Sequence, residues 1–90
     1  MAKVSIPAGL QKYFKNETEL KSDAPTVREL LAQLEKKYPE SREKILASSD
    51  VLCRYIRIFV DNEDIGELEK LETPLNAKTR VKILMALAGG

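Results

Sequence analysis

The stretch that decides the fold is Arg54-Tyr55-Ile56-Arg57-Ile58-Phe59-Val60-Asp61-Asn62-Glu63-Asp64-Ile65. In its first half the residues that fall on one face are Ile56, Ile58 and Val60. This spacing predicts a half-buried β-strand over residues 54–60. The pair Asp61-Asn62 tolerates the positive φ of a tight turn. The stretch therefore predicts a strand that turns back into a short strand over residues 63–65.

A helix is predicted over residues 26–38. Its start fits a capping box, in which the Thr26 hydroxyl accepts a hydrogen bond from the Glu29 amide while the Glu29 side chain reaches back. Its apolar stripe at helical spacing consists of Val27, Leu30, Leu31, Leu34 and Tyr38. Pro39 ends the helix, because a residue before proline is pushed out of helical geometry.

The remaining segments complete an α+β pattern. Further strands are predicted over residues 3–7, 17–21 and 80–84, a short helix over 40–46, a polar loop over 47–50, and a loop with one helical turn over 66–76. Leu10, Tyr13 and Phe14 are expected to pack on the core from a turn or loop. A hairpin, a crossing helix and returning strands form a roll.

This order of elements is that of the β-grasp fold. We expect a mixed sheet of four to five strands with one main helix packed on one face. If the first and last strands lie parallel at the centre of this sheet, the crossover rule makes the connection between them right-handed. We expect residues 1–85 to form the domain and residues 86–90 to form a flexible tail.

Composition restricts the class of protein. Ninety residues fit one domain. The 15 basic and 14 acidic residues argue against nucleic acid or an anionic membrane as the main partner. No apolar run approaches the ~20 residues of a membrane span, no signal peptide opens the chain, and one cysteine forms no internal disulfide. We expect a cytoplasmic protein that is a monomer when free.

The polar residues do not assemble an obvious active site. The chain has no histidine, no cysteine pair for zinc and no glycine-rich phosphate loop. The lone Cys53 is typical of a small buried hydrophobe rather than a nucleophile. We therefore expect a protein that enzymes act on, with no catalytic residue, bound metal or bound cofactor of its own.

The last two residues are Gly89-Gly90. A glycine pair has no Cβ, so it can thread a channel that other residues would block, and it presents one carboxyl group. A frayed terminus without a role is the alternative. Together with the predicted fold, the glycine pair indicates that Gly90 is the functional end of the chain.

A docking surface is predicted on the sheet face opposite the helix. Tyr55, Arg57 and Phe59 fall on that face, and Leu84 extends it toward the tail. Aromatic residues and arginine dominate interface energies. Ordinary strand composition accounts for the aromatics equally well.

The strand-turn segment and the ending Val81-Lys82-Ile83-Leu84-Met85-Ala86-Leu87-Ala88-Gly89-Gly90 resemble the ubiquitin-like sulfur-carrier family of the ThiS and MoaD type. The resemblance covers nearly the whole chain. These proteins serve thiamine, molybdopterin and cysteine biosynthesis, and the chain looks most like the carrier of a thiocarboxylate-dependent cysteine pathway.

The resemblance implies a chemistry for the tail. A ubiquitin-activating-type adenylyltransferase, which binds ATP and magnesium, would join AMP to the Gly90 carboxylate. Sulfur would displace AMP and leave a thiocarboxylate, which a sulfur-accepting synthase would consume. Gly89 would supply backbone freedom, and Ala88 and Leu87 would form the stem that the partner contacts.

Three other functions remain open at this point. The protein could be a modifier that forms isopeptide bonds through Gly90, or the small subunit of a molybdopterin synthase. It could also be a β-grasp interaction domain with an idle terminus. The pathway stays open as well, because the partner enzyme chooses the acceptor.

Overall fold

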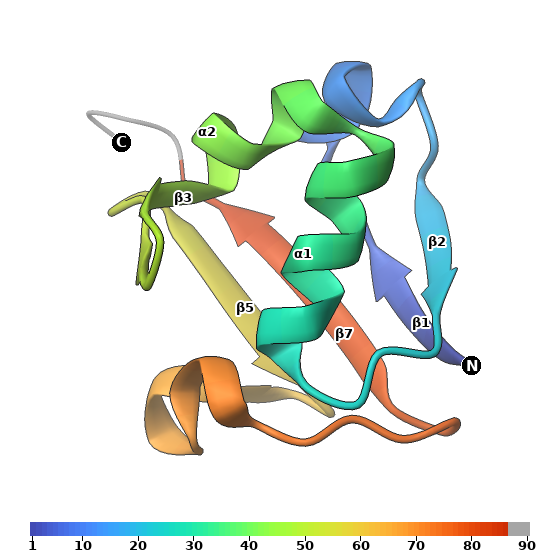
Figure 1. The fold of residues 1–90 in the computed structure, drawn as a ribbon, viewed down its shortest axis with the longest axis vertical. Helices are drawn as coiled ribbons and strands as arrows, with labels where there is room; N and C mark the ends of the chain where they lie inside the picture. The colour runs from blue at the N-terminus through green and yellow to red at the C-terminus, as the bar shows by residue number, and fades with distance from the viewer. Residues whose placement is uncertain (87–90) are drawn as a thin grey trace.

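The computed structural model describes residues 1–86, which form one mixed five-stranded sheet crossed by a helix (Figure 1). The strand order is β2-β1-β7-β5-β6. The bounds are Ala2–Ser5 for β1, Glu19–Ser22 for β2, Ile56–Val60 for β5, Glu63–Asp64 for β6 and Arg80–Met85 for β7. The helix α1 spans Val27–Lys37 and lies across one face of the sheet. This arrangement is the predicted β-grasp fold.

The first and last strands, β1 and β7, lie side by side and parallel. Val4 of β1 is in register with Val81 of β7, and Val81 in turn lies opposite Val60 of β5. All three side chains are buried. The alternation of apolar residues that the sequence shows is therefore the inner face of the sheet.

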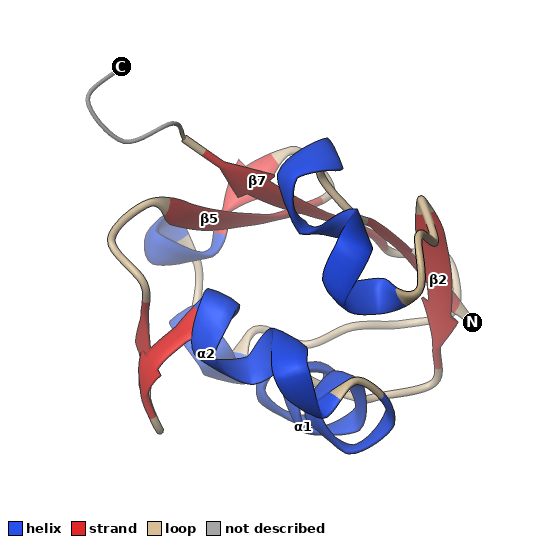
Figure 2. Ribbon diagram, turned by 90° about the horizontal axis from the view of Figure 1, so that it is seen from above, coloured by secondary structure: helices blue, strands red, loops and turns tan. Residues whose placement is uncertain are grey.

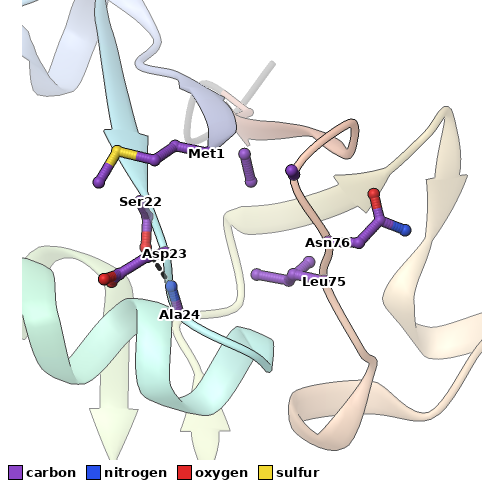
Figure 3. A pocket seen from close by; sticks show the side chains of 8 residues that line it. Met1, Ser22, Asp23, Ala24, Leu75 and Asn76 are labelled. Carbon is purple, nitrogen blue, oxygen red and sulfur yellow. Dashed lines mark hydrogen bonds between the residues drawn. The ribbon is translucent and has the colours of Figure 1, made fainter.

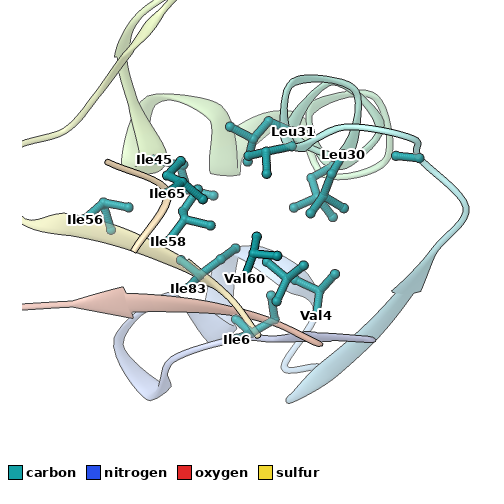
Figure 4. Packing of buried hydrophobic residues seen from close by; sticks show 14 of the residues in the cluster. Val4, Ile6, Leu30, Leu31, Ile45, Ile56, Ile58, Val60, Ile65 and Ile83 are labelled. Atoms are coloured by element: carbon teal, nitrogen blue, oxygen red, sulfur yellow. The ribbon is translucent and has the colours of Figure 1, made fainter. Parts of the chain in front are cut away.

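The helix covers that inner face. Figure 4 shows Leu30 and Leu31 of α1 facing side chains of the sheet, among them Val4 and Val60. Figure 2 shows the same two layers from above, with β5 and β7 in one and α1 in the other. The core thus lies between the helix and the sheet.

The predicted ends of the helix are present. The Thr26 hydroxyl accepts a hydrogen bond from the Glu29 amide at 3.2 Å, which is one half of the capping box. Among residues 1–86, no hydrogen bond returns from the Glu29 side chain to the Thr26 amide. At the other end, the buried ring of Tyr38 packs on Phe14, with 5.1 Å between the ring centroids.

The predicted turn at Asp61-Asn62 is also present. Both residues have positive φ, 48° and 72°. The turn is tied to the start of β7, because the Asp61 amide donates to the Arg80 carbonyl at 2.8 Å and the Arg80 amide donates to Asp61 Oδ1 at 2.9 Å.

Several shorter elements differ from the prediction. The polar loop expected over residues 47–50 is part of a hairpin, formed by β3 (Leu46–Ser48) and β4 (Val51–Leu52). Its sequence shows little alternation. In the structure, Arg28 of α1 pairs with Asp50 in the hairpin and, at 2.6 Å, with Glu72. Because the paired residues are far apart in the sequence, no local sequence pattern predicts these ion pairs.

Strand and helix bounds also move by a few residues. β5 begins at Ile56 rather than Arg54, and β2 begins at Glu19. The short helices are η1 (Ala8–Phe14), η2 (Pro39–Ser41), α2 (Arg42–Ile45), η3 (Ile65–Glu67) and η4 (Lys70–Glu72), where η marks a 3-10 helix. The helix expected over 40–46 is therefore a 3-10 turn followed by a single α-helical turn.

The two faces of the sheet should differ in their tolerance of mutation. Ile58 is fully buried, so Ile58→Ala should lower the free energy of unfolding by about 2–5 kcal/mol through the cavity it leaves. Leu84 is 44% exposed on the opposite face, so Leu84→Ala should change it by about 0.5 kcal/mol or less. Urea unfolding measures both values. Equal losses would contradict the assignment of the two faces.

Candidate functional site

The candidate site lies where β7 ends. Met85, the last residue of β7, is in register with Ile56, and the Ala86 amide donates to the Tyr55 carbonyl at 2.8 Å. The chain is therefore fixed to β5 through Ala86. In Figure 1 this end of β7 lies at the same end of the molecule as α2.

The predicted tail residues Leu87, Ala88, Gly89 and Gly90 lie outside the described residues. The boundary predicted after residue 85 stays a prediction. The described part contributes the root of the tail, and two surfaces flank this root.

The first surface is on the sheet face opposite α1, where three of the four predicted docking residues meet. Arg57 is directly opposite Leu84 across the β5–β7 pair, and Phe59 is opposite Lys82. Leu84 is exposed and Phe59 is half-buried. We call Arg57, Phe59 and Leu84 the outer patch.

Tyr55, the fourth residue predicted for this face, does not lie on it. Because β5 begins at Ile56, the alternation of the strand does not extend to Tyr55. Its half-buried ring packs against the core and lines a pocket with Tyr13 and Met85. Burial raises the pKa of the Tyr55 phenol, and the neighbouring Cys53 adds to the rise.

Arg57 is oriented within the outer patch by Asp64 of β6. The guanidinium donates to Asp64 Oδ2 at 3.0 Å, and the Gly66 amide donates to Asp64 Oδ1 at 2.8 Å. The Gly66 amide and then Arg57 lower the pKa of the Asp64 carboxyl. The arginine itself stays 71% exposed, so it remains available to a partner.

A separate pocket lies at the other end of the sheet (Figure 3). It has a volume of about 180 Å³, and the residues that line it include Met1, Ser22, Asp23, Ala24, Leu75 and Asn76. The Ser22 hydroxyl accepts from the Ala24 amide at 3.0 Å and donates to Gln33 at 2.7 Å. This pocket lies at the end of the sheet where β7 begins, so it is not part of the tail root, which lies where β7 ends.

Within residues 1–86, no group of three histidine, cysteine, aspartate or glutamate side chains is placed to hold a metal ion. None of the helices in this part of the chain is both long enough and apolar enough to cross a membrane. Cys53 is half-buried, and its sulfur lies 3.6 Å from the Glu43 carbonyl oxygen.

Replacing Arg57 with alanine should raise the pKa of Asp64 toward its unfolded value of about 3.9, because one of its two hydrogen-bond donors is lost. The lowered pKa stabilises the fold above about pH 3.9, and this contribution is lost as pH falls through the folded-state pKa. The wild type should therefore lose more stability on acidification than Arg57→Ala. NMR titration of the Asp64 carboxyl measures the shift, with Arg80→Ala as the control, and an unchanged pKa in Arg57→Ala would contradict the contact.

Comparisons with known proteins agree with this geometry. The sequence model of the ThiS family matches residues 4–90. The chain is similar to the sulfur carrier protein CysO of Mycobacterium tuberculosis, with 29% identity over 89 residues, 97% of this chain and 96% of that protein.

Solved structures are similar as well. A chain of the Amycolatopsis orientalis BexX/CysO complex has a TM-score of 0.89 and 28% identity, with 100% of both chains covered. Small archaeal modifier protein 1 from Methanosarcina acetivorans has a TM-score of 0.85 and 30% identity, with 99% of this chain and 95% of that chain covered.

Proposed function

Because the chain belongs to the ThiS family and is a sulfur carrier protein, we propose that it carries sulfur as a thiocarboxylate on Gly90 for cysteine biosynthesis. The observation that carries this proposal is the likeness to CysO proteins along nearly the whole chain. The match to the ThiS family extends to residue 90 and so includes Gly89 and Gly90. The likeness to CysO also favours the cysteine branch over the thiamine and molybdopterin branches.

The proposed chemistry begins with activation of the Gly90 carboxylate. A carboxylate is a poor electrophile, because attack would have to expel an oxide-like leaving group. An activating enzyme that binds ATP and magnesium would transfer AMP to a carboxylate oxygen and release pyrophosphate. Sulfide would then attack the carbonyl carbon, so that a C–S bond forms, the C–O bond to AMP breaks, and a thiocarboxylate remains.

The protein would act as a co-substrate in these steps rather than as an enzyme. Gly90 would be the site of covalent change, and Gly89 would allow close approach of the backbone. Ala88 and Leu87 would form the stem inside the partner's channel. A sulfur-accepting synthase would then take the sulfur from Gly90.

We also propose that the activating enzyme docks on the outer patch. The outer patch combines an aromatic ring, an exposed leucine and an arginine. Aromatic residues and arginine are enriched at the centres of interfaces. The outer patch includes Leu84 of β7, which precedes the tail root at Ala86 by two residues. We further propose that the protein is cytoplasmic, because its single cysteine forms no internal disulfide of the kind common in oxidising compartments. We also propose that it is a monomer when free.

Incubation with the activating enzyme, ATP and sulfide should replace one oxygen of the protein by sulfur, as intact-mass spectrometry would detect. Deletion of Gly90 should abolish the replacement, because the reactive carboxyl group is then one residue too short for the active site. A wild-type protein whose mass does not change would contradict the proposal.

Phe59→Ala should raise the KM of the activating enzyme for this protein about tenfold, the loss expected for an anchor of an interface. The matched control is Val51→Ala, because Val51 is 55% exposed but lies on the β3–β4 hairpin. Thermal unfolding should show both variants folded. An unchanged KM for Phe59→Ala would exclude the outer patch as the docking surface.

A second candidate function is protein modification. The likeness to the Methanosarcina acetivorans small archaeal modifier protein, at 30% identity over nearly the whole chain, favours it. The adenylation step would be the same, but lysine amines would replace sulfide as the attacking group. Expression of a tagged protein in cells should give a ladder of heavier tagged species if the modifier function operates, and deletion of Gly90 should remove the ladder.

A further inference from the structure

A second surface lies on the inner side of the tail root, facing away from the outer patch. It is a pocket of about 280 Å³ whose lining includes Gly9, Lys12, Tyr13, Lys44, Tyr55 and Met85. We call this cavity the tail-root pocket. Its volume is just below the ~300–1,000 Å³ of pockets that hold small ligands, so it fits a single inserted side chain better than a cofactor.

The floor of the tail-root pocket is apolar. Tyr13, Tyr55 and Met85 are half-buried and pack against the hydrophobic core. Gly9 leaves room for Met85, since a Cβ at position 9 would lie 2.0 Å from the terminal methyl carbon of Met85. The pocket therefore offers an inserted apolar side chain two aromatic rings and a thioether.

The mouth of the pocket is positively charged. The ammonium groups of Lys12 and Lys44 each lie 5.2 Å from the centroid of the Tyr13 ring. Within residues 1–86, no carboxylate oxygen comes within 4 Å of either ammonium group. Two lysines that converge on one ring without a carboxylate make a place for a negative charge from outside the described chain.

The position of the pocket limits what can cover it. Ala86 is part of the pocket wall, and four residues follow it in the sequence. Even a fully extended chain of four residues reaches only about 14 Å. An enzyme that holds Gly90 in its active site must therefore come close to the mouth of the tail-root pocket.

We propose that the tail-root pocket is a second docking site for the activating enzyme, which inserts an apolar side chain between Tyr13, Tyr55 and Met85. A carboxylate beside that side chain pairs with Lys12 and Lys44. This inference rests on the proposed function, in which such an enzyme adenylates Gly90. The activating enzyme then contacts the tail root on both faces of the sheet.

The test measures the KM of ATP-dependent adenylation by the activating enzyme. The double variant Lys12→Glu/Lys44→Glu should raise KM at least about tenfold, because like charges then face each other. Raising the salt concentration should raise KM for the wild type and lower it for this variant, because salt screens attraction and repulsion alike.

The matched control is Lys70→Glu/Lys78→Glu, which makes the same change of charge on exposed residues before β7, at the other end of the molecule. Its KM should stay within about twofold of the wild type. A third variant, Gly9→Leu, displaces the Met85 side chain that lines the pocket, without changing charge, and should also raise KM. Urea unfolding checks that each variant is folded.

The outcomes separate the two proposals. If wild type and the Lys12→Glu/Lys44→Glu variant are adenylated with the same KM, the second docking site is wrong and the sulfur-carrier chemistry stands. If the control raises KM as much as the pocket variant, overall charge is the cause and the pocket proposal is also wrong. If the enzyme does not adenylate the wild type, both proposals fail.

Discussion

The structure depends on the parallel pairing of β1 with β7 at the centre of the sheet. Val4 and Val81 lie side by side in this pair, and both are buried beneath α1. Parallel neighbours cannot be joined by a tight turn, so the chain must cross a face of the sheet between them. The helix α1 lies on that path, and its apolar stripe closes the core.

Placing β7 at the centre has a consequence for the tail. A strand at the edge would be held on one side, whereas β7 is paired with β1 on one side and β5 on the other. Toward its end it remains paired with β5, and the Ala86 amide continues this pairing to the Tyr55 carbonyl. Under the proposed function, a partner enzyme that binds Gly90 would therefore act on a tail whose root is fixed in the sheet.

The alternation of side chains along β7 also divides the tail root between two surfaces. Leu84 points to the outer patch, and the next residue, Met85, contributes to the tail-root pocket. An apolar surface with one arginine lies on one side, and an apolar pocket with two lysines lies on the other. Two such surfaces around the tail root suit the proposed function, in which enzymes act on the last residues of the chain.

Much of the fold could be predicted from the sequence, because its signals are local. The alternation from Ile56 to Val60, the Thr26 cap and the positive-φ pair Asp61-Asn62 each act within a few residues. The β3–β4 hairpin could not be predicted in this way, because its strands have only three and two residues. Its short strands carry almost no periodicity.

The candidate site could likewise be predicted only where its signals are local. Strand alternation predicted that the residues of the outer patch share one face of the sheet. It also placed Tyr55 on that face, which is wrong, because β5 begins only at Ile56. The tail-root pocket was missed, because its residues come from η1, α2, the residue before β5 and the end of β7. The sequence signals only that Tyr13 and its apolar neighbours pack on the core.

The central claim is that sulfur travels on the carboxyl terminus and not on the one thiol of the chain. Fragment-ion mass spectrometry of the protein after reaction with the activating enzyme, ATP and sulfide tests it most directly, on wild type and on Cys53→Ser. We predict that the added sulfur is on Gly90 in both proteins. A Gly90 that keeps both carboxylate oxygens, in the wild type or in Cys53→Ser, would contradict the account.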